Sequence, residues 1–290
     1  MENETNKVER DLEEIVAFIA LGKVVPFLGP GILGFSKNAE SVPQSPEMLA
    51  ESLAALVAVP SRIRKNLWSA SQYIENYRHR KTLKTLLSQI FDADLEPNDL
   101  QRWLARIPQL PLVVDVWYDA SFSVALKEER QSWGQIQGVS QAEYPGNWVK
   151  AYDWEDREVG MEAAFAWQTV LYKPIGSVKP QKNFIISDSD YVEVLTEIDI
   201  QTPIPDLIKE LRKDKHFLFL GCRFQSQIER TWARQIIKRS SAVHWAVLTS
   251  PLTKNEKRFL VEQNIKQLDL PLDVFARKLF ASPSFALPLS

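Results

Sequence analysis

The sequence has few of the residues that build disulfide scaffolds and zinc sites. It contains one cysteine and three histidines among 290 residues. A single cysteine excludes a disulfide framework and a cysteine-rich zinc site, and a site on the three scattered histidines would also need carboxylates. We therefore expect no metal. Cys222 follows an apolar run, and we interpret it as a small buried hydrophobe and not as a reactive thiol.

Long apolar runs are also missing. No stretch approaches the ~18 residues that a membrane-spanning helix needs, and the longest candidate, residues 24–35, is interrupted by Gly29, Pro30, Gly31 and Gly34. The first five residues carry two glutamates, where a secretory signal would carry basic residues. The sequence predicts a cytoplasmic protein with no membrane partner.

Neither sign of charge is in excess. The chain has 35 basic and 37 acidic residues and a formal net charge of −2, so no overall field attracts nucleic acid. The densest basic run is Arg78-His79-Arg80-Lys81. We interpret it as a solvated helix junction, because a nucleic-acid site needs a wider basic stripe. Nucleic acid is not favoured as a partner, whereas a protein partner or a second copy of the chain stays open.

The apolar pattern predicts an α/β fold. Short apolar runs predict strands over 24–28, 112–117, 167–172, 183–186, 217–220, 243–248 and 265–268. Amphipathic stretches between the later runs predict helices over 204–212, 225–238, 254–263 and 272–280. Strands that alternate with helices favour a doubly wound, mostly parallel Rossmann-like sheet covered on both faces.

We expect one domain over residues 1–290, with two insertions. A helix is predicted over 8–21. Residues 45–107 form a helical insertion after the first strand, with helices predicted at 48–57, 63–77, 81–91 and 98–107. Residues 127–160 show no clear period and are interpreted as an irregular, Trp-rich insertion. Five of the nine tryptophans fall between residues 117 and 167. We interpret them as packing in a small core, with an interaction surface or a base-stacking lid as the alternative.

Ligands of a doubly wound sheet bind beyond the carboxyl ends of its strands, so the residues that follow each strand are the candidate site. Glycines in such turns let backbone amides approach a phosphate or ribose closely. Four segments qualify: Gly29-Pro30-Gly31-Ile32, Trp117-Tyr118-Asp119, Lys173-Pro174-Ile175-Gly176-Ser177 and Gly221-Cys222-Arg223-Phe224.

Taken in order, these segments resemble the sirtuin-like (silent-information-regulator-two-like) family. Its Phe-x-Gly-Ala-Gly-x-Ser is similar to the seven residues 27–33, and its Asn-Tyr-Asp stands where Trp117-Tyr118-Asp119 lies. Its Lys-Leu-His-Gly-Ser is similar to residues 173–177, and its Phe-Leu-Gly-Tyr-Ser to the run that begins at Phe219. The resemblance extends from Phe27 to Phe280. It implies a fold that binds NAD or an ADP-ribose-type nucleotide.

Several positions depart from the family pattern. The Asn and His that form the catalytic pair of active relatives are replaced by Trp117 and Ile175, and neither side chain accepts a proton. Pro30 replaces Ala and removes a backbone N–H from the phosphate loop, and Leu33 replaces Ser. The resemblance therefore leans against an enzyme. A deacylase is the least favoured reading, because one cysteine cannot build the family's zinc ribbon.

Three functions stay open. The first is a non-catalytic protein that binds NAD or an ADP-ribose-type nucleotide, or that serves as a regulatory or assembly partner. The second is a divergent NAD glycohydrolase that uses Asp119 and Tyr118. The third is a protein-interaction scaffold. We interpret His79, His216 and His244 as satisfied or solvated, and expect the last two at the sheet end opposite the ligand.

Overall fold

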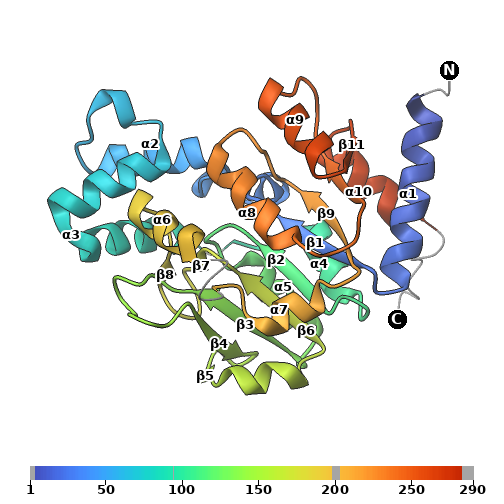
Figure 1. Cartoon of the computed structure of the whole chain (residues 1–290), viewed down its shortest axis with the longest axis horizontal. Coiled ribbons are helices and arrows are strands. Elements are labelled where there is room, and N and C mark those ends of the chain that lie inside the picture. The colour runs from blue at the N-terminus through green and yellow to red at the C-terminus, as the bar shows by residue number, and fades with distance from the viewer. Residues whose placement is uncertain (1–3, 94, 198–202, 283–290) are drawn as a thin grey trace.

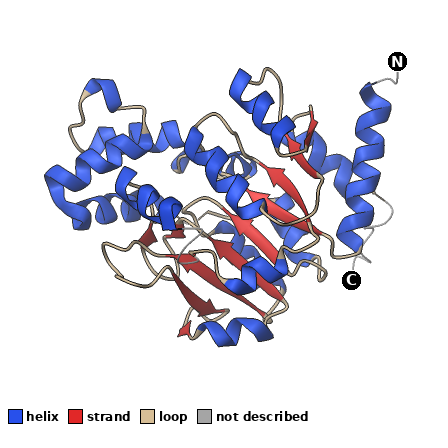
Figure 2. Ribbon diagram, in the orientation of Figure 1, coloured by secondary structure: helices blue, strands red, loops and turns tan. Residues whose placement is uncertain are grey.

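The computed structural model describes residues 4–93, 95–197 and 203–282. A central twisted sheet crosses the molecule, and helices lie on both of its faces (Figures 1 and 2). Within the described residues the main sheet has nine strands, in the order β11-β10-β9-β1-β2-β6-β3-β4-β5. Neighbours from β11 through β3 are parallel, and β4 and β5 are added antiparallel at one edge. The α/β, mostly parallel class is confirmed.

Seven of the eleven strands in the described residues lie at runs that the sequence predicts. Their bounds are β1 (Val24–Leu28), β2 (Leu112–Asp115), β3 (Trp133–Gly138), β4 (Val149–Asp153), β5 (Glu158–Val159), β6 (Thr169–Lys173), β7 (Gly176–Ser177), β8 (Asn183–Phe184), β9 (His216–Leu220), β10 (His244–Val247) and β11 (Ile265–Leu268). The strand predicted over 183–186 is shorter than expected. It pairs antiparallel with β7 in a separate two-stranded sheet and not in the main one.

The helices that cover the sheet begin mostly at the capping residues visible in the sequence. Their bounds are α1 (Glu4–Ala20), α2 (Pro46–Leu56), α3 (Leu67–Phe91), α4 (Asp99–Arg106), α5 (Ser121–Glu129), α6 (Asp188–Glu197), α7 (Asp206–Leu211), α8 (Gln227–Ile237), α9 (Lys254–Glu262) and α10 (Leu272–Phe280). Capping boxes open α4, α8 and α9. No helix in these described ranges is long and apolar enough to cross a membrane.

Arg80 connects the helical insertion between β1 and β2 to α6 and to β8 of the small sheet. The predicted helices 63–77 and 81–91 are the two halves of α3, which breaks at His79 (φ 69°, ψ 153°). The next residue, Arg80, pairs with Asp190 at 2.6 Å and with Glu75 at 3.1 Å, and its guanidinium also donates to the carbonyl of Phe184. The interpretation of the basic run as solvated is therefore wrong for Arg80, because the network removes its side chain from water.

The expectation of an irregular insertion over residues 127–160 is wrong. The segment begins in the last turn of α5, and it then contributes β3, β4 and β5 to the main sheet. All six residues of β3 are buried, including Gln135 and Gln137, whose side-chain amides donate to the carbonyl of Lys179 at 2.9 and 2.7 Å. Buried glutamines with a shared acceptor break the apolar alternation that reveals a strand in sequence.

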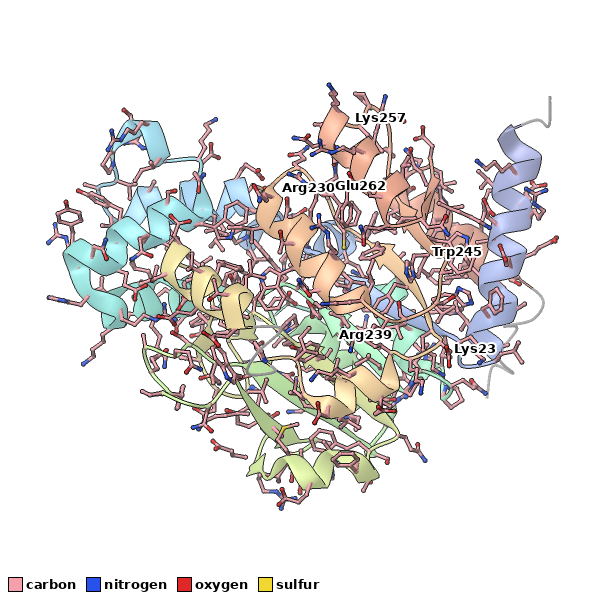
Figure 3. All side chains as sticks on the ribbon, viewed as in Figure 1. Lys23, Arg230, Arg239, Trp245, Lys257 and Glu262 are labelled. Atoms are coloured by element: carbon pink, nitrogen blue, oxygen red, sulfur yellow. The ribbon has the colours of Figure 1, made fainter. Side chains whose placement is uncertain are left out.

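The tryptophan-rich stretch packs inward. Trp117 and Trp133 are buried, and Trp148, Trp154 and Trp167 are partly buried against the core, as the core interpretation predicts. On the opposite side of the molecule, α1 lies beside α10 and covers Trp245 of β10 (Figure 3). The chain thus has one continuous hydrophobic core that runs under both ends of the sheet.

Candidate functional site

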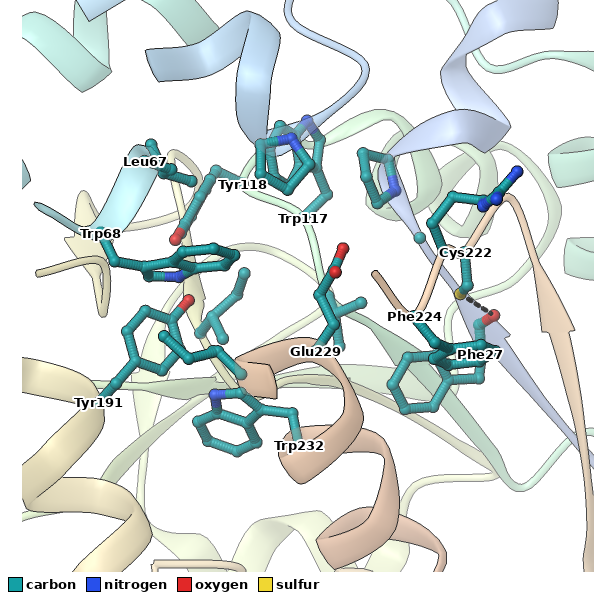
Figure 4. A pocket seen from close by; sticks show the side chains of 17 residues that line it. Phe27, Leu67, Trp68, Trp117, Tyr118, Tyr191, Cys222, Phe224, Glu229 and Trp232 are labelled. Carbon is teal, nitrogen blue, oxygen red and sulfur yellow. Dashed lines mark hydrogen bonds between the residues drawn. The ribbon is translucent and has the colours of Figure 1, made fainter. Parts of the chain in front are cut away.

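The order in which strands are added to the sheet reverses at β1, which has β2 on one side and β9 on the other. A reversal of this kind opens a crevice at the carboxyl ends of the strands, where doubly wound proteins bind ligands. The structure has a cavity at this point, between the ends of β1, β2 and β9 and the helices α2, α3, α6 and α8 (Figure 4). The cavity lies at the edge of the sheet where the strand-end argument expects a ligand, and that it binds one stays a prediction.

Some of the predicted site residues line this cavity and others do not. Those that line it are Gly29, Pro30, Trp117, Tyr118, Ile175, Cys222, Arg223 and Phe224. Those that do not are Gly31, Ile32, Asp119, Gly176, Ser177 and Gly221. The volume is about 60 Å³, well under the roughly 300–1,000 Å³ of a pocket for a drug-sized ligand.

The loop after β1 is packed directly on the turn after β9. The amide of Gly29 donates to the carbonyl of Leu220 at 2.9 Å. The amide of Gly31 donates to the carbonyl of Gly221 at 2.8 Å. The Ile32 amide is used within the loop, by the Gly29 carbonyl at 3.2 Å. Gly221 has φ +66°, and a Cβ there would lie 2.2 Å from the Ile32 nitrogen, so only glycine fits. These amides are committed to the protein itself.

Trp117 and Ile175, which the resemblance places at the positions of a catalytic pair, are both buried. The indole Nε1 of Trp117 donates to the carbonyl of Pro43 at 2.8 Å, and its ring lies edge-on to Phe91. The indole is thus anchored to the segment that precedes α2. Neither side chain offers a base to the cavity.

Asp119, the base of the glycohydrolase alternative, points away from the cavity. Its carboxylate accepts from the amide of Ser121 at 2.8 Å and from the Ser121 hydroxyl at 2.5 Å, at the start of α5. Tyr118 does line the cavity, but its hydroxyl donates to the carbonyl of Ile185 at 2.8 Å, and burial raises the pKa of Tyr118 well above its usual value. Asp119 and Tyr118 therefore do not form an acid–base pair in this arrangement.

A buried ion pair holds two of the predicted segments together. The Lys173 Nζ lies 2.8 Å from the Asp115 carboxylate and 2.7 Å from the Asp119 carbonyl. Both side chains are almost fully buried, and burial raises the pKa of Asp115 to about 6 against the opposing effect of Lys173. The Ser177 hydroxyl donates to the same Asp119 carbonyl at 3.2 Å. These buried polar groups hold the segments after β2 and β6 together.

The cysteine and the histidines take the places expected of them. Cys222 is buried at the cavity wall, and burial raises the pKa of its thiol. His216 and His244 lie at the amino ends of β9 and β10, away from the cavity, and His244 Nδ1 accepts from the amide of Phe217 at 3.0 Å. Within the described residues no cluster of three or more His, Cys, Asp or Glu could hold a metal ion.

Sequence reasoning missed the residues that give the cavity its chemistry. Glu229 of α8 points toward its centre, and aromatic side chains from three helices surround it: Trp68, Tyr191 and Trp232 (Figure 4). Burial raises the pKa of Glu229 to about 7, and the nearby Glu47 and Glu256 raise it further, against the effect of hydrogen bonds from Ser226. The Ser226-x-x-Glu229 capping box is visible in the sequence, but nothing in that motif indicates that its glutamate faces a cavity.

A comparison with protein families decides the assignment. The SIR2-like domain matches residues 111–268, more than half of the chain. The chain belongs to the SIR2-like family. No curated protein matches the chain. The family is associated with NAD, so the next question is whether the residues of this SIR2-like chain fit that cofactor.

The residues present do not fit NAD. A pyrophosphate needs free backbone amides at the glycine loop, whereas this SIR2-like chain has committed those of Gly29, Gly31 and Ile32, and Pro30 has none. The carboxylate of Glu229 faces the place that an anionic ligand would approach. The 60 Å³ cavity is also too small for a dinucleotide.

Proposed function

We propose that this SIR2-like chain is non-catalytic and serves as a regulatory or assembly partner of another protein, and that it does not turn over NAD. The observation that carries the proposal is the pairing of the glycine loop with the β9 turn, through Gly29 with Leu220 and Gly31 with Gly221. That pairing uses the donors a dinucleotide would need. The replacement of the family's acid–base residues by Trp117 and Ile175 supports the same conclusion.

The experiment is a nicotinamide-release assay with NAD. We expect release no faster than in buffer at any protein concentration, because the loop amides that would hold the NAD pyrophosphate are bonded to the β9 turn. Release that rises with protein concentration and is lost in Asp119→Asn would support the glycohydrolase instead. Asn keeps an acceptor for the amide of Ser121, the first residue of α5. We therefore expect the variant to stay folded, so that a loss of activity would report on the carboxylate.

Nucleotide sensing without catalysis is the second candidate. It is favoured by the convergence of predicted strand-end residues, among them Gly29, Trp117 and Cys222, on a single cavity. A sensor of this kind requires the loop of residues 29–32 to separate from Gly221, with the loss of two backbone hydrogen bonds. Saturation transfer from the protein to NAD, with no nicotinamide release, would favour it over the partner role.

A further inference from the structure

The cavity at the end of the sheet has an uncommon composition for its size. Its walls are mostly aromatic and aliphatic, and one carboxylate, that of Glu229, points into them (Figure 4). The carboxylate is held by the amide of Ser226 at 2.8 Å. Within the described residues no lysine or arginine forms an ion pair with it. The Glu229 side chain is only partly exposed to solvent, and a carboxylate in such a place is stabilised by a nearby positive charge, which the described residues do not supply.

The cations nearest to the cavity are already engaged. Arg223 lies on its wall, but its guanidinium pairs with Glu256 through two contacts at 2.8 and 3.1 Å. Arg230 donates to the carbonyls of Phe224 and Gln225. A cation from outside the chain therefore meets no competing lysine or arginine of the described residues at Glu229.

The aromatic walls of the cavity favour one class of cation over others. A primary ammonium carries three N–H donors and a guanidinium carries five, and each needs acceptors that an aromatic wall lacks. A methylated ammonium has no N–H donor to satisfy, and aromatic rings attract it through cation–π interactions. A divalent metal ion requires several oxygen ligands, and no such cluster exists among the described residues.

We propose that this cavity binds a small organic cation, a methylated ammonium group such as that of choline, with the Glu229 carboxylate as counter-charge and the surrounding aromatic rings as walls. The site goes beyond the partner role proposed above and does not depend on it. The volume of about 60 Å³ leaves no room to bury more than a compact head group. We assign the ligand to free small molecules, in preference to a lipid or a modified protein.

The pH at which Glu229 ionises makes binding depend on pH. Its pKa of about 7 means that about a tenth of the side chains are charged at pH 6 and about nine tenths at pH 8. The titratable or charged groups of the neighbouring elements are Glu47 of α2, Tyr118 after β2, Tyr191 of α6, Cys222 and Arg223 after β9, and Glu256 of α9. The tyrosines and the cysteine are neutral over this range, because burial raises the pKa of each.

The test is calorimetric titration of the whole chain with tetramethylammonium and with choline at pH 8. We expect saturable binding by both, at least tenfold weaker binding of dimethylbutanol, the uncharged carbon isostere of choline, and about tenfold weaker choline binding at pH 6. If dimethylbutanol bound as tightly as choline, the positive charge would contribute nothing to binding, and the proposal would be overturned. No saturable binding of either cation would also overturn it.

Variants separate the role of Glu229 from general effects. Glu229→Gln preserves the size of the side chain and the capping box, and we expect it to weaken choline binding at least tenfold at pH 8. Glu262→Gln removes an exposed carboxylate at the end of α9 and is expected to change nothing (Figure 3). Unchanged binding by Glu229→Gln would contradict the proposal, and near-ultraviolet circular dichroism shows that each variant is folded. Tighter binding of a trimethyl-lysine peptide than of choline would overturn the assignment to small molecules.

Discussion

Glu229 and Glu256 occupy the same capping-box position on the successive helices α8 and α9, but only Glu256 lies against a guanidinium, that of Arg223 at 2.8 Å. The pKa values of the two carboxyl groups move in opposite directions as a result. Burial raises that of Glu229 to about 7, whereas hydrogen bonds from Arg223 and Thr253 outweigh burial and lower that of Glu256. One motif thus produces a stabilising ion pair in one helix and a titratable cavity group in the other.

The first prediction concerns the stability of Glu229→Gln. Between pH 4.5 and about 7 the folded chain holds a proton on Glu229 that the unfolded chain has lost, so the free energy of unfolding falls as pH rises through this range. Glutamine does not ionise, so the variant lacks this fall in the free energy of unfolding. We expect the variant to gain up to about 3 kcal/mol over the parent chain on going from pH 5 to pH 8, measured by urea unfolding.

Glu256→Gln provides the contrast for that experiment. Its pKa is lowered in the folded chain, so its contribution is present above the unfolded value of 4.5 and is lost as the pH falls through the lower, folded value. We expect this variant to lose about 1–3 kcal/mol at pH 8, because Arg223 is left without its partner. The same pH dependence in both variants would refute the difference between the two carboxylates.

The second prediction concerns the ion pair below the cavity. Lys173→Met removes the only ion-pair partner that the described residues give to the buried Asp115. Loss of one member of a buried pair typically costs about 3–5 kcal/mol. We expect a loss of this size at pH 8 and a smaller one at pH 5, where the pKa of Asp115, about 6 with lysine present, lets the carboxyl group be neutral. An equal loss at both pH values would show that packing, not charge, dominates.

The third prediction concerns the break in α3. His79 has φ 69° and ψ 153°, a region that non-glycine residues seldom adopt, and its side chain is exposed. His79→Gly relieves the strain but increases the freedom of the unfolded chain, so we expect a net gain of about 1 kcal/mol in urea unfolding. His79→Ala removes the same imidazole and keeps the Cβ. A similar gain in both variants would assign the effect to the imidazole and contradict the prediction.

The fourth prediction concerns His244 at the far end of the sheet. Burial lowers its pKa to about 4, in agreement with its role as acceptor for the Phe217 amide. Because the unfolded chain binds the proton first, this residue contributes stability above pH 6.5 that is lost as the pH falls toward 4. Proton NMR of the three histidines should show one ring that titrates near pH 4. A midpoint above 6 would contradict the buried, neutral state.

Much of the fold follows from local patterns in the sequence. Val24–Leu28 is a strand with the predicted bounds, because a short apolar run that glycine ends allows few alternatives. The interruption of α3 falls at the predicted junction near residues 78–80. By contrast, β3 was not predictable, since its buried Gln135 and Gln137 are satisfied by the carbonyl of Lys179, more than forty residues away in sequence.

The location of the site was predictable, but its chemistry was not. Parallel strands bring Gly29, Trp117 and Cys222 to one edge, so their convergence follows from topology. Asp119 looked like a base in sequence, yet its side chain caps α5 because Ser121 lies two residues on. Glu229 looked like a cap and also faces the cavity. Such orientations depend on tertiary packing and not on spacing along the chain.

The central claim is that this SIR2-like chain neither binds nor hydrolyses NAD through its glycine loop. The most direct measurement is a saturation-transfer proton NMR time course with NAD, with a parallel sample that contains excess ADP-ribose. We expect no saturation transfer to NAD and no growth of free nicotinamide signals, because the loop amides are bonded to the β9 turn. Nicotinamide that accumulates in proportion to protein, or saturation transfer that ADP-ribose suppresses, would contradict the account.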